Sequence, residues 1–242
     1  MRILFWNIKH GGGYRAGKIS EQILDWNPDI VALAEFRGTA PSRSIAQNLH
    51  DAGYIHQLST IFDDEPTWNA LFVASRFEIS KACLEGTPEP DYLWMPVKVH
   101  TKPSLYIGVI LVPLGNQWYE YLDALVGVAK DWQPGAGVII GDTNCALTGL
   151  DEDTEYSDDF RDRFMTPLIE LGWRDVFRSF HPHVDAPTWY SSFGNGFRLD
   201  HVYVNAKLQA HVASCEYDWG RTWEQKKLSD HAAILLDLKL PD

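Results

Sequence analysis

Short apolar segments predicted to be β-strands recur along the whole chain of 242 residues, and several of them run directly into a polar residue. The clearest example is "VIIGDTNCAL" at 138–147, where an aliphatic run is followed by Gly141, Asp142, Thr143 and Asn144. A buried strand that stops on a carboxylate and a carboxamide has two explanations. Either the polar residues form a turn, for instance an Asx-turn at Asp142, or their side chains belong to a catalytic or binding site.

The order of the segments indicates the fold class. Strands are predicted at 2–7, 29–35, 69–75, 94–101, 104–112, 137–142, 188–192, 197–205, 210–217 and 232–240, and helices at 18–27, 42–53, 117–132 and about 158–171. Early strand–helix alternation followed by hairpins predicts an α/β protein with mixed sheets. No repeat or low-complexity linker divides the sequence, so residues 1–242 are expected to form a single domain.

Charge and composition narrow the function classes. Asp and Glu number 33 against 21 Lys and Arg, a net charge of −12, which excludes a protein that coats nucleic acid by bulk charge but allows a nuclease with a local basic groove. The three cysteines are few and far apart, which indicates neither a disulfide framework nor a zinc cluster. No apolar run approaches the ~20 residues of a membrane span, and "MRILFWNIKH" is strand-like rather than a signal segment, so a cytoplasmic protein without membrane contact is expected.

Polar residues at strand ends form the candidate site, because strand ends on one edge of a sheet lie in one place. They are Asn7, Glu35, Asp142, Asp200, Asp230 and His231, with Asn144 two residues after Asp142. Oxygen donors without sulfur suit a hard cation such as Mg²⁺ or Mn²⁺. A histidine beside an aspartate can present one ring nitrogen to a substrate. Together these groups indicate in-line attack on a phosphorus ester, although His231 taken alone is more typical of a structural histidine.

Five motifs carry a resemblance to a known superfamily. "FWN" at 5–7, "ALAEFRG" at 32–38, "IIGDTN" at 139–144, "FRLDHVYV" at 197–204 and "LSDHAAI" at 228–234 resemble, in order and spacing, the endonuclease/exonuclease/phosphatase superfamily. The exonuclease III and apurinic-endonuclease branch is the most similar. The resemblance implies a DNase I-like, four-layered α/β sandwich, with two mixed β-sheets face to face and helices outside.

The resemblance also implies roles for the residues that hold the metal. Glu35 would be the principal metal ligand and Asn7 would adjoin the metal site. Asp230 would lie near a possible second metal position.

Four further residues would carry the reaction. By the same resemblance, Asp142 would orient or deprotonate the attacking water and Asn144 would contact the phosphate. Asp200 would hydrogen-bond His231, which would face a non-bridging phosphate oxygen.

Two positions depart from the superfamily pattern. Lys9 stands where many members have an aspartate, which removes a candidate metal ligand and adds positive charge. Leu111 stands where many others have His or Tyr, which removes a donor to the phosphate. Either activity is lower than in typical members, or His10 or Tyr119 supplies the missing donor.

Three further features bear on the substrate. The segment 9–18, "KHGGGYRAGK", is either a phosphate-binding loop or a flexible surface turn, and Arg37 would reinforce its basic side. Trp189 and Phe197 would stack on a base or an abasic sugar, or belong to the core. The acidic run at 151–159 is either a solvated loop or a rim that repels a long polyanion. The residues assigned to substrate binding are Lys9, His10, Arg15, Arg37, Trp189 and Phe197.

The main hypothesis is therefore a nuclease or phosphodiesterase that uses Mg²⁺ or Mn²⁺ to cleave DNA or RNA, working as a monomer. A phosphatase acting on a small phosphorylated metabolite is the second, and the acidic balance favours it. A catalytically silent phosphate-binding module is the third, which Lys9 and Leu111 leave open.

Overall fold

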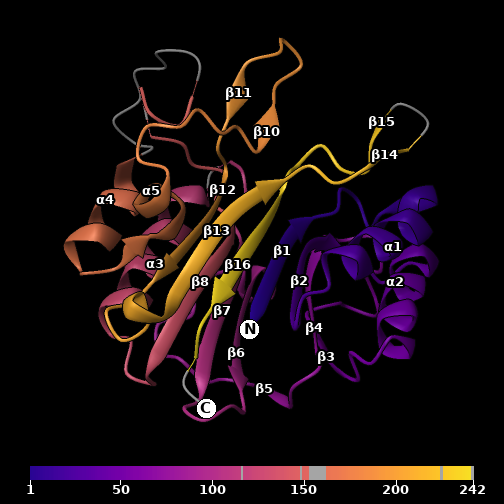
Figure 1. The fold of residues 1–242 in the computed structure, drawn as a ribbon, viewed down its shortest axis with the longest axis horizontal. Coiled ribbons are helices and arrows are strands. Elements are labelled where there is room, and N and C mark those ends of the chain that lie inside the picture. Colours follow the sequence, from indigo (N-terminus) through magenta and orange to yellow (C-terminus); the bar gives the residue numbers. More distant parts are fainter. Residues whose placement is uncertain (116, 148, 153–161, 224–225, 241–242) are drawn as a thin grey trace.

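Two six-stranded mixed sheets pack face to face, with helices on their outer faces (Figure 1). The computed structural model describes residues 1–115, 117–147, 149–152, 162–223 and 226–240. The first sheet has the order β13-β16-β1-β2-β4-β3. Its strands are β1 (Arg2–Asn7), β2 (Ile30–Phe36), β3 (His56–Ser59), β4 (Ala70–Ser75), β13 (Val212–Asp218) and β16 (Ala233–Leu238).

The second sheet has the order β5-β6-β7-β8-β12-β9. Its strands are β5 (Ile79–Lys81), β6 (Trp94–Val99), β7 (Leu105–Leu111), β8 (Ala136–Asp142), β9 (Arg174–Asp175) and β12 (Asp200–Val204). Each sheet contains one parallel pair, β1–β2 in the first and β7–β8 in the second. Two short hairpins complete the described strands: β10 (Trp189–Tyr190) with β11 (Gly196–Phe197), and β14 (Thr222–Trp223) with β15 (Lys226–Lys227).

The helices form the two outer layers. Helices α1 (Ala16–Trp26) and α2 (Ala40–Asp51) lie beside the first sheet, whereas α3 (Trp118–Lys130), α4 (Asp162–Glu170) and α5 (Val176–Phe180) lie beside the second (Figure 1). The predicted four-layered sandwich is thus confirmed. No helix among the described residues combines the length and the apolar character that a bilayer span requires.

Strand β1 shows why the sequence folds into layers. Ile3 and Phe5 belong to the core between the sheets, and Leu4 and Trp6 belong to the core under α1 and α2. Successive side chains of a strand point to opposite faces, so a strand covered on both faces must be apolar throughout. Full burial of each such side chain contributes about 1.5–3 kcal/mol.

The structure divides the strand predicted at 197–205. Residue 197 ends β11 and residue 200 begins β12, because the guanidinium of Arg198 turns inward to two buried carboxylates. Strands β3, β5 and β9 and helix α5 were not predicted. They are short, and β3, "HQLS", lacks the apolar alternation that identifies a strand.

Candidate active site

A cleft of about 890 Å³ opens where β1, β2 and β8 end and β16 begins. That volume lies in the range typical of ligand sites. Most of the predicted residues line it: Lys9, His10, Glu35, Arg37, Asp142, Asn144, Trp189, Phe197, Asp230 and His231. Asn7 and Asp200 lie directly behind this lining, fully buried. The structure therefore brings together the polar strand ends of both sheets.

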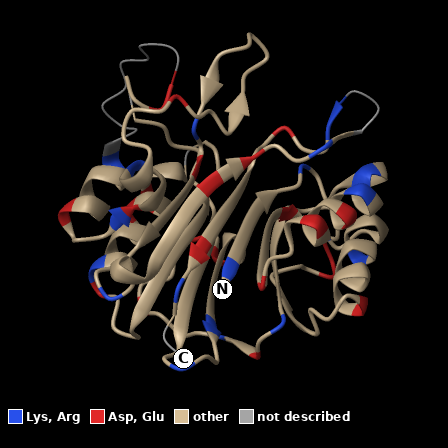
Figure 2. Ribbon diagram, in the orientation of Figure 1, with Lys and Arg blue, Asp and Glu red and all other residues tan. Residues whose placement is uncertain are grey.

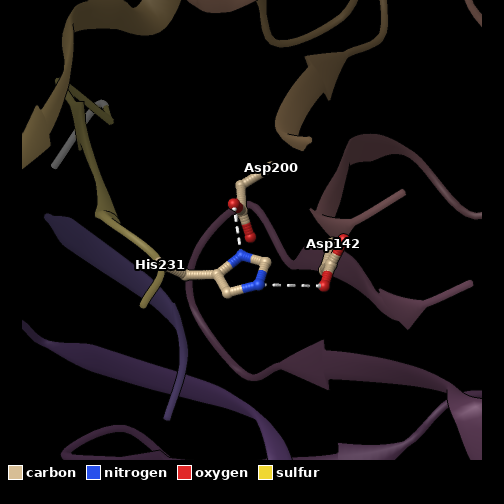
Figure 3. A group of neighbouring side chains, drawn as sticks. All are labelled: Asp142, Asp200 and His231. Carbon is tan, nitrogen blue, oxygen red and sulfur yellow. Dashed lines mark hydrogen bonds and ion pairs between the residues drawn. The ribbon is translucent and has the colours of Figure 1, made fainter. Parts of the chain in front are cut away.

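His231 lies between two aspartates, as Figure 3 shows. Its Nδ1 is 2.9 Å from Asp200 Oδ2, and its Nε2 is 3.9 Å from Asp142 Oδ2. The two aspartates are opposite one another in the β8–β12 pairing, a position where like charges repel. The imidazole relieves this repulsion, and its hydrogen bond to Asp200 fixes which ring nitrogen faces Asp142.

The protonation of this cluster is strongly shifted. Burial raises the pKa of Asp142 to about 7, and the nearby Asp200 charge adds to the increase. Burial alone would lower the pKa of His231, but attraction to Asp200 and Asp142 outweighs it and raises the pKa to about 10. At neutral pH His231 is therefore a buried cation beside carboxylates.

Asn7 connects the two sheets at the base of the cleft. Its amide Nδ2 donates to Asp142 Oδ2 at 3.0 Å and to Glu35 Oε1 at 3.2 Å. Its Oδ1 accepts from the backbone N–H of Lys9 at 3.0 Å. The carboxylate of Glu35 also accepts the backbone N–H of His10 at 2.8 Å. The side chain of Asn7 thus holds Glu35 and Asp142, one from each sheet, close to a common point.

The segment 138–147 forms a turn and also places polar side chains in the candidate site. Asp142 Oδ1 accepts the backbone N–H of Asn144 at 3.0 Å, which is an Asx-turn, while Oδ2 faces Asn7 and His231. A Cβ atom at Gly141 would lie 2.1 Å from the carbonyl oxygen of Ile110. Position 141, directly before Asp142, therefore accepts only glycine, because any side chain there would clash with the backbone of β7. The Asn144 amide is held by the Val112 carbonyl at 2.7 Å.

Backbone strain is concentrated in the cleft. Among the described residues, five other than glycine have positive φ, and four of them line the cleft: Lys9 (53°), His10 (52°), Glu35 (53°) and Asn144 (49°). Each such residue costs about 1–3 kcal/mol unless its surroundings compensate, and such residues cluster at functional sites. The fifth, Asn27, caps helix α1.

The donor set fits a hard divalent cation. Glu35 and Asp142 supply carboxylate oxygen atoms that share the amide Nδ2 of Asn7 as a donor, and one ligand atom from each of Asp142, Asp200 and His231 lies within 4.8 Å of the others. Asp200 Oδ1 is buried with no hydrogen-bond partner, and burial of the Asp142 carboxyl already raises its pKa. Both observations indicate negative charge that a cation would stabilise. Since Asp200 is already hydrogen-bonded to His231, Glu35 with Asn7 is the better place for it.

Asp230 forms an ion pair with Lys9. Its Oδ2 lies 2.6 Å from Lys9 Nζ. Burial alone would raise the pKa of Asp230, but the hydrogen bond from Lys9 and the charge of His231 lower it. An ammonium group therefore neutralises the carboxylate that the resemblance placed near a second metal.

The substrate residues predicted from the 9–18 segment divide into two groups. His10 Nδ1 lies 3.0 Å from Glu35 Oε2 and 2.9 Å from Arg37 Nη2, inside the cleft. Arg15 is not in the cleft lining. Its guanidinium donates to the backbone carbonyls of Ile8, Lys9 and Leu228, so it holds this loop in place.

The other predicted donors and aromatics can also be placed. Leu111 lines the cleft with an apolar side chain, and His10, one of the two residues expected to supply a donor in its place, lines the same cleft. Tyr119 does not line the cleft and lies beside Arg163. Trp189 and Phe197 pack together with ring centroids 6.0 Å apart, and both face the cleft half-buried.

The acidic segment requires a correction. Asp151 is buried and paired with Arg198, with Nε 2.7 Å from Oδ1, so it does not lie at the rim. Arg198 also binds Asp175 at 2.7 Å. Residues 153–159 of the segment lie outside the described residues. No local pattern in the sequence indicates this buried pairing, because the partners are far apart along the chain.

Aromatic residues of a second wall were also missed. Trp68 and Tyr92 line the cleft, together with Asn69. They come from a loop and a short helical turn without strand or helix periodicity, so no pattern in the sequence identified them.

The sequence model of the Endonuclease/Exonuclease/phosphatase family matches residues 4–231. No curated protein sequence matches the chain.

Solved structures match over nearly the whole chain. A 3′-5′ exonuclease from Neisseria meningitidis has a TM-score of 0.79 and 22% identity, with 99% of this chain and 100% of that chain covered. A Neisseria 3′ phosphatase bound to a product DNA hairpin has a TM-score of 0.80 and 21% identity, with 99% of this chain and 100% of that chain covered. An AP endonuclease from Archaeoglobus fulgidus has a TM-score of 0.80 and 20% identity, again with 99% of this chain and 100% of that chain covered. The fold is thus the one expected from the exonuclease III and apurinic-endonuclease resemblance.

Proposed function

The chain belongs to the endonuclease/exonuclease/phosphatase family, and on this basis we propose that it is a divalent-metal-dependent nuclease that cleaves phosphodiester bonds of DNA or RNA. The coarser activity, hydrolysis of a phosphate ester, follows from the family. The proposal of a metal-dependent nuclease rests on the site, and its main support is the placement of His231 between Asp142 and Asp200.

We assign the chemical roles as follows. The raised pKa of Asp142 lets its carboxylate accept a proton from water near neutral pH. The imidazolium of His231, kept protonated by Asp200, stabilises the negative charge that develops on the phosphate oxygens. Asn144 lies beside them to orient the phosphate.

The proposed cofactor is Mg²⁺ or Mn²⁺, held by Glu35 beside Asn7. When bound, it supplies Lewis-acid polarisation of a phosphate oxygen. The chain's own contribution is to hold Glu35 in a strained conformation, with φ 53°, through hydrogen bonds from Asn7 and the His10 backbone.

Nucleic acid is the substrate that the cleft supports best. Its volume of about 890 Å³ and its aromatic lining suit a nucleotide better than a small phosphorylated metabolite. A phosphatase is the second candidate, because a structurally similar Neisseria protein is described as a 3′ phosphatase. We also propose that residues 1–242 act as one monomeric domain, since both sheets contribute to one core and one cleft.

A substrate panel tests this function. Purified protein is incubated with Mg²⁺ or Mn²⁺ and labelled single-stranded, duplex and abasic DNA, RNA, and phosphate monoesters. We expect cleavage of at least one polynucleotide, abolished by a chelator and by the His231→Ala substitution. Hydrolysis of monoesters alone would favour the phosphatase, and no turnover of any substrate would favour the silent phosphate-binding module.

A further inference from the structure

Three aromatic rings form a cluster on the cleft wall that carries Arg37. Phe62 lies 5.1 Å from Tyr92 and 6.1 Å from Trp68, and Trp68 lies 5.8 Å from Tyr92, measured between ring centroids. Trp68 and Tyr92 line the cleft, and Phe62 packs against both rings from outside this lining. Trp68 is 48% exposed, a large apolar area facing the same space as Glu35 and His231.

The cluster is held in a fixed position. Thr60 Oγ1 donates to the Tyr92 carbonyl at 2.6 Å and accepts the backbone N–H of Leu71 at 2.8 Å, which ties the loop to strand β4 and to the turn bearing Tyr92. A Cβ atom at Gly38 would lie 3.1 Å from atoms of Pro66. The loop therefore packs closely against the chain just after Arg37. Rings that are fixed in advance lose little entropy when a ligand binds.

The charges around the cluster favour a neutral ligand group. Asp63, Asp64 and Glu65 in the same loop are exposed acids, which oppose a row of phosphates along this wall. Deeper in the cleft, Arg37 Nε donates to Asn69 Oδ1 at 2.8 Å, next to Trp68. A flat, uncharged ring with polar edges fits this combination of apolar faces, an amide and acidic surroundings.

We propose that Trp68 and Tyr92, backed by Phe62, form a stacking site for one unpaired nucleobase of the substrate next to the scissile phosphate. This inference rests on the proposed function, because it places the base of the same nucleic acid. It adds that the enzyme prefers a strand with an unpaired base at this position to one that lacks the base. Stacking on aromatic side chains corresponds to about 5- to 150-fold in affinity per base.

The test compares two single-stranded DNA oligonucleotides of equal length. One has all its bases, and the other has tetrahydrofuran abasic residues on both sides of the cleavage position. Binding is measured by fluorescence anisotropy in EDTA, and turnover is measured with Mg²⁺. The proteins are wild type, Trp68→Ala, Trp68→Phe and the control Phe180→Ala, whose ring is 45% exposed but lies outside the cleft lining. Thermal unfolding verifies that each variant folds.

We expect wild type to bind the complete oligonucleotide at least about fivefold more tightly than the abasic one. Trp68→Ala should lose that preference, Trp68→Phe should keep most of it, and Phe180→Ala should keep all of it. Equal binding of both oligonucleotides by wild type, or an unchanged preference in Trp68→Ala, would overturn the stacking site. Cleavage without base preference would leave the proposed function intact, whereas base-dependent binding without hydrolysis of any substrate would contradict the proposed function alone.

Discussion

Lys9 Nζ and Asp230 Oδ2 form an ion pair 2.6 Å long at the cleft. The backbone of Lys9 has a left-handed conformation, with φ 53°, and the hydrogen bond from its N–H to Asn7 Oδ1 stabilises that conformation. The ammonium group therefore provides a fixed positive charge beside His231. A metal ion at Asp230 would have to displace this charge, which supports the proposal of a single metal position at Glu35.

The first prediction concerns metal stoichiometry. Wild-type protein should bind one Mn²⁺ ion in isothermal titration calorimetry, and Lys9→Ala should bind a second, weaker ion, because the substitution frees Asp230. Lys18→Ala is the control, since Lys18 pairs with Glu21 on helix α1. Two ions in the wild-type protein would show that Lys9 does not exclude the second.

Glu35 should dominate the affinity of the first ion. Glu35→Gln keeps the shape of the side chain but removes its charge, so the Mn²⁺ concentration for half-maximal turnover should rise by at least the roughly 10- to 100-fold that loss of a residue supporting a metal ligand costs. The control is Glu21→Gln, whose partner Lys18 lies outside the cleft. A metal dependence like that of wild type in Glu35→Gln would move the principal ligand elsewhere.

His231 should matter far more to turnover than its burial suggests. Loss of a positioned electrostatic or acid–base group costs about 10²–10⁴ in rate, so folded His231→Ala should be nearly inactive. Steady-state turnover is measured together with circular dichroism. If this variant keeps more than about a tenth of the wild-type rate, the histidine is structural.

Much of this site could be predicted because most of its residues stand at or next to an end of an apolar strand. Strands β1, β2 and β8 end where Asn7, Glu35 and Asp142 were expected to meet. Period and polarity are local properties, so a single sequence contains them. The two mixed sheets and the main helices could be predicted for the same reason.

The remaining features depend on contacts distant in sequence. Asp151 belonged to an acidic run, and only the pairing with Arg198 shows that it is buried. Arg15 was predicted to bind phosphate, but three backbone carbonyls hold its guanidinium. The left-handed backbone of Glu35 is set by its surroundings, since glutamate has no intrinsic preference for it.

The pH dependence of turnover should reflect both shifted groups. The reaction needs Asp142 deprotonated, so kcat/KM should rise as pH increases through its pKa of about 7. It also needs His231 protonated, so kcat/KM should fall as pH increases through about 10. Asp200→Asn removes the strongest attraction on the imidazolium and should move the alkaline fall to lower pH. An alkaline limb that does not move would show that another group titrates there.

The buried Asp151–Arg198 pair should stabilise the fold. Arg198 is 1% exposed, and breaking such a pair leaves a buried charge at a cost of about 3–5 kcal/mol, so Asp151→Asn should lower the free energy of unfolding by that amount in urea. The control Asp123→Asn breaks the exposed pair with Arg163 and should cost less than about 1 kcal/mol. Burial would raise the pKa of Asp151, but His201 and Arg198 lower it well below its ordinary value. Its contribution to stability is therefore complete above about pH 4 and is lost at lower pH.

The last prediction concerns how the enzyme holds a polyanion. Figure 2 shows Lys and Arg interspersed with Asp and Glu over both helical layers. In the cleft, Lys9 is paired with Asp230, and Arg37 is hydrogen-bonded to His10 and Asn69. Counterion release gives a slope of about −0.9 in log affinity against log salt per duplex phosphate neutralised. We therefore expect a shallow slope for duplex DNA, on the order of two to four phosphates.

Anisotropy in EDTA across a salt series measures this slope. Arg37→Ala should reduce its magnitude by about one phosphate, that is by about 0.9. Lys81→Ala is the control, because Lys81 lies on strand β5 and is absent from the cleft lining, and its slope should equal that of wild type. A steep slope that Arg37→Ala leaves unchanged would mean that DNA binds outside the cleft. The aromatic walls would then have no access to the bound strand, and the phosphate at His231 would have to belong to a small ester.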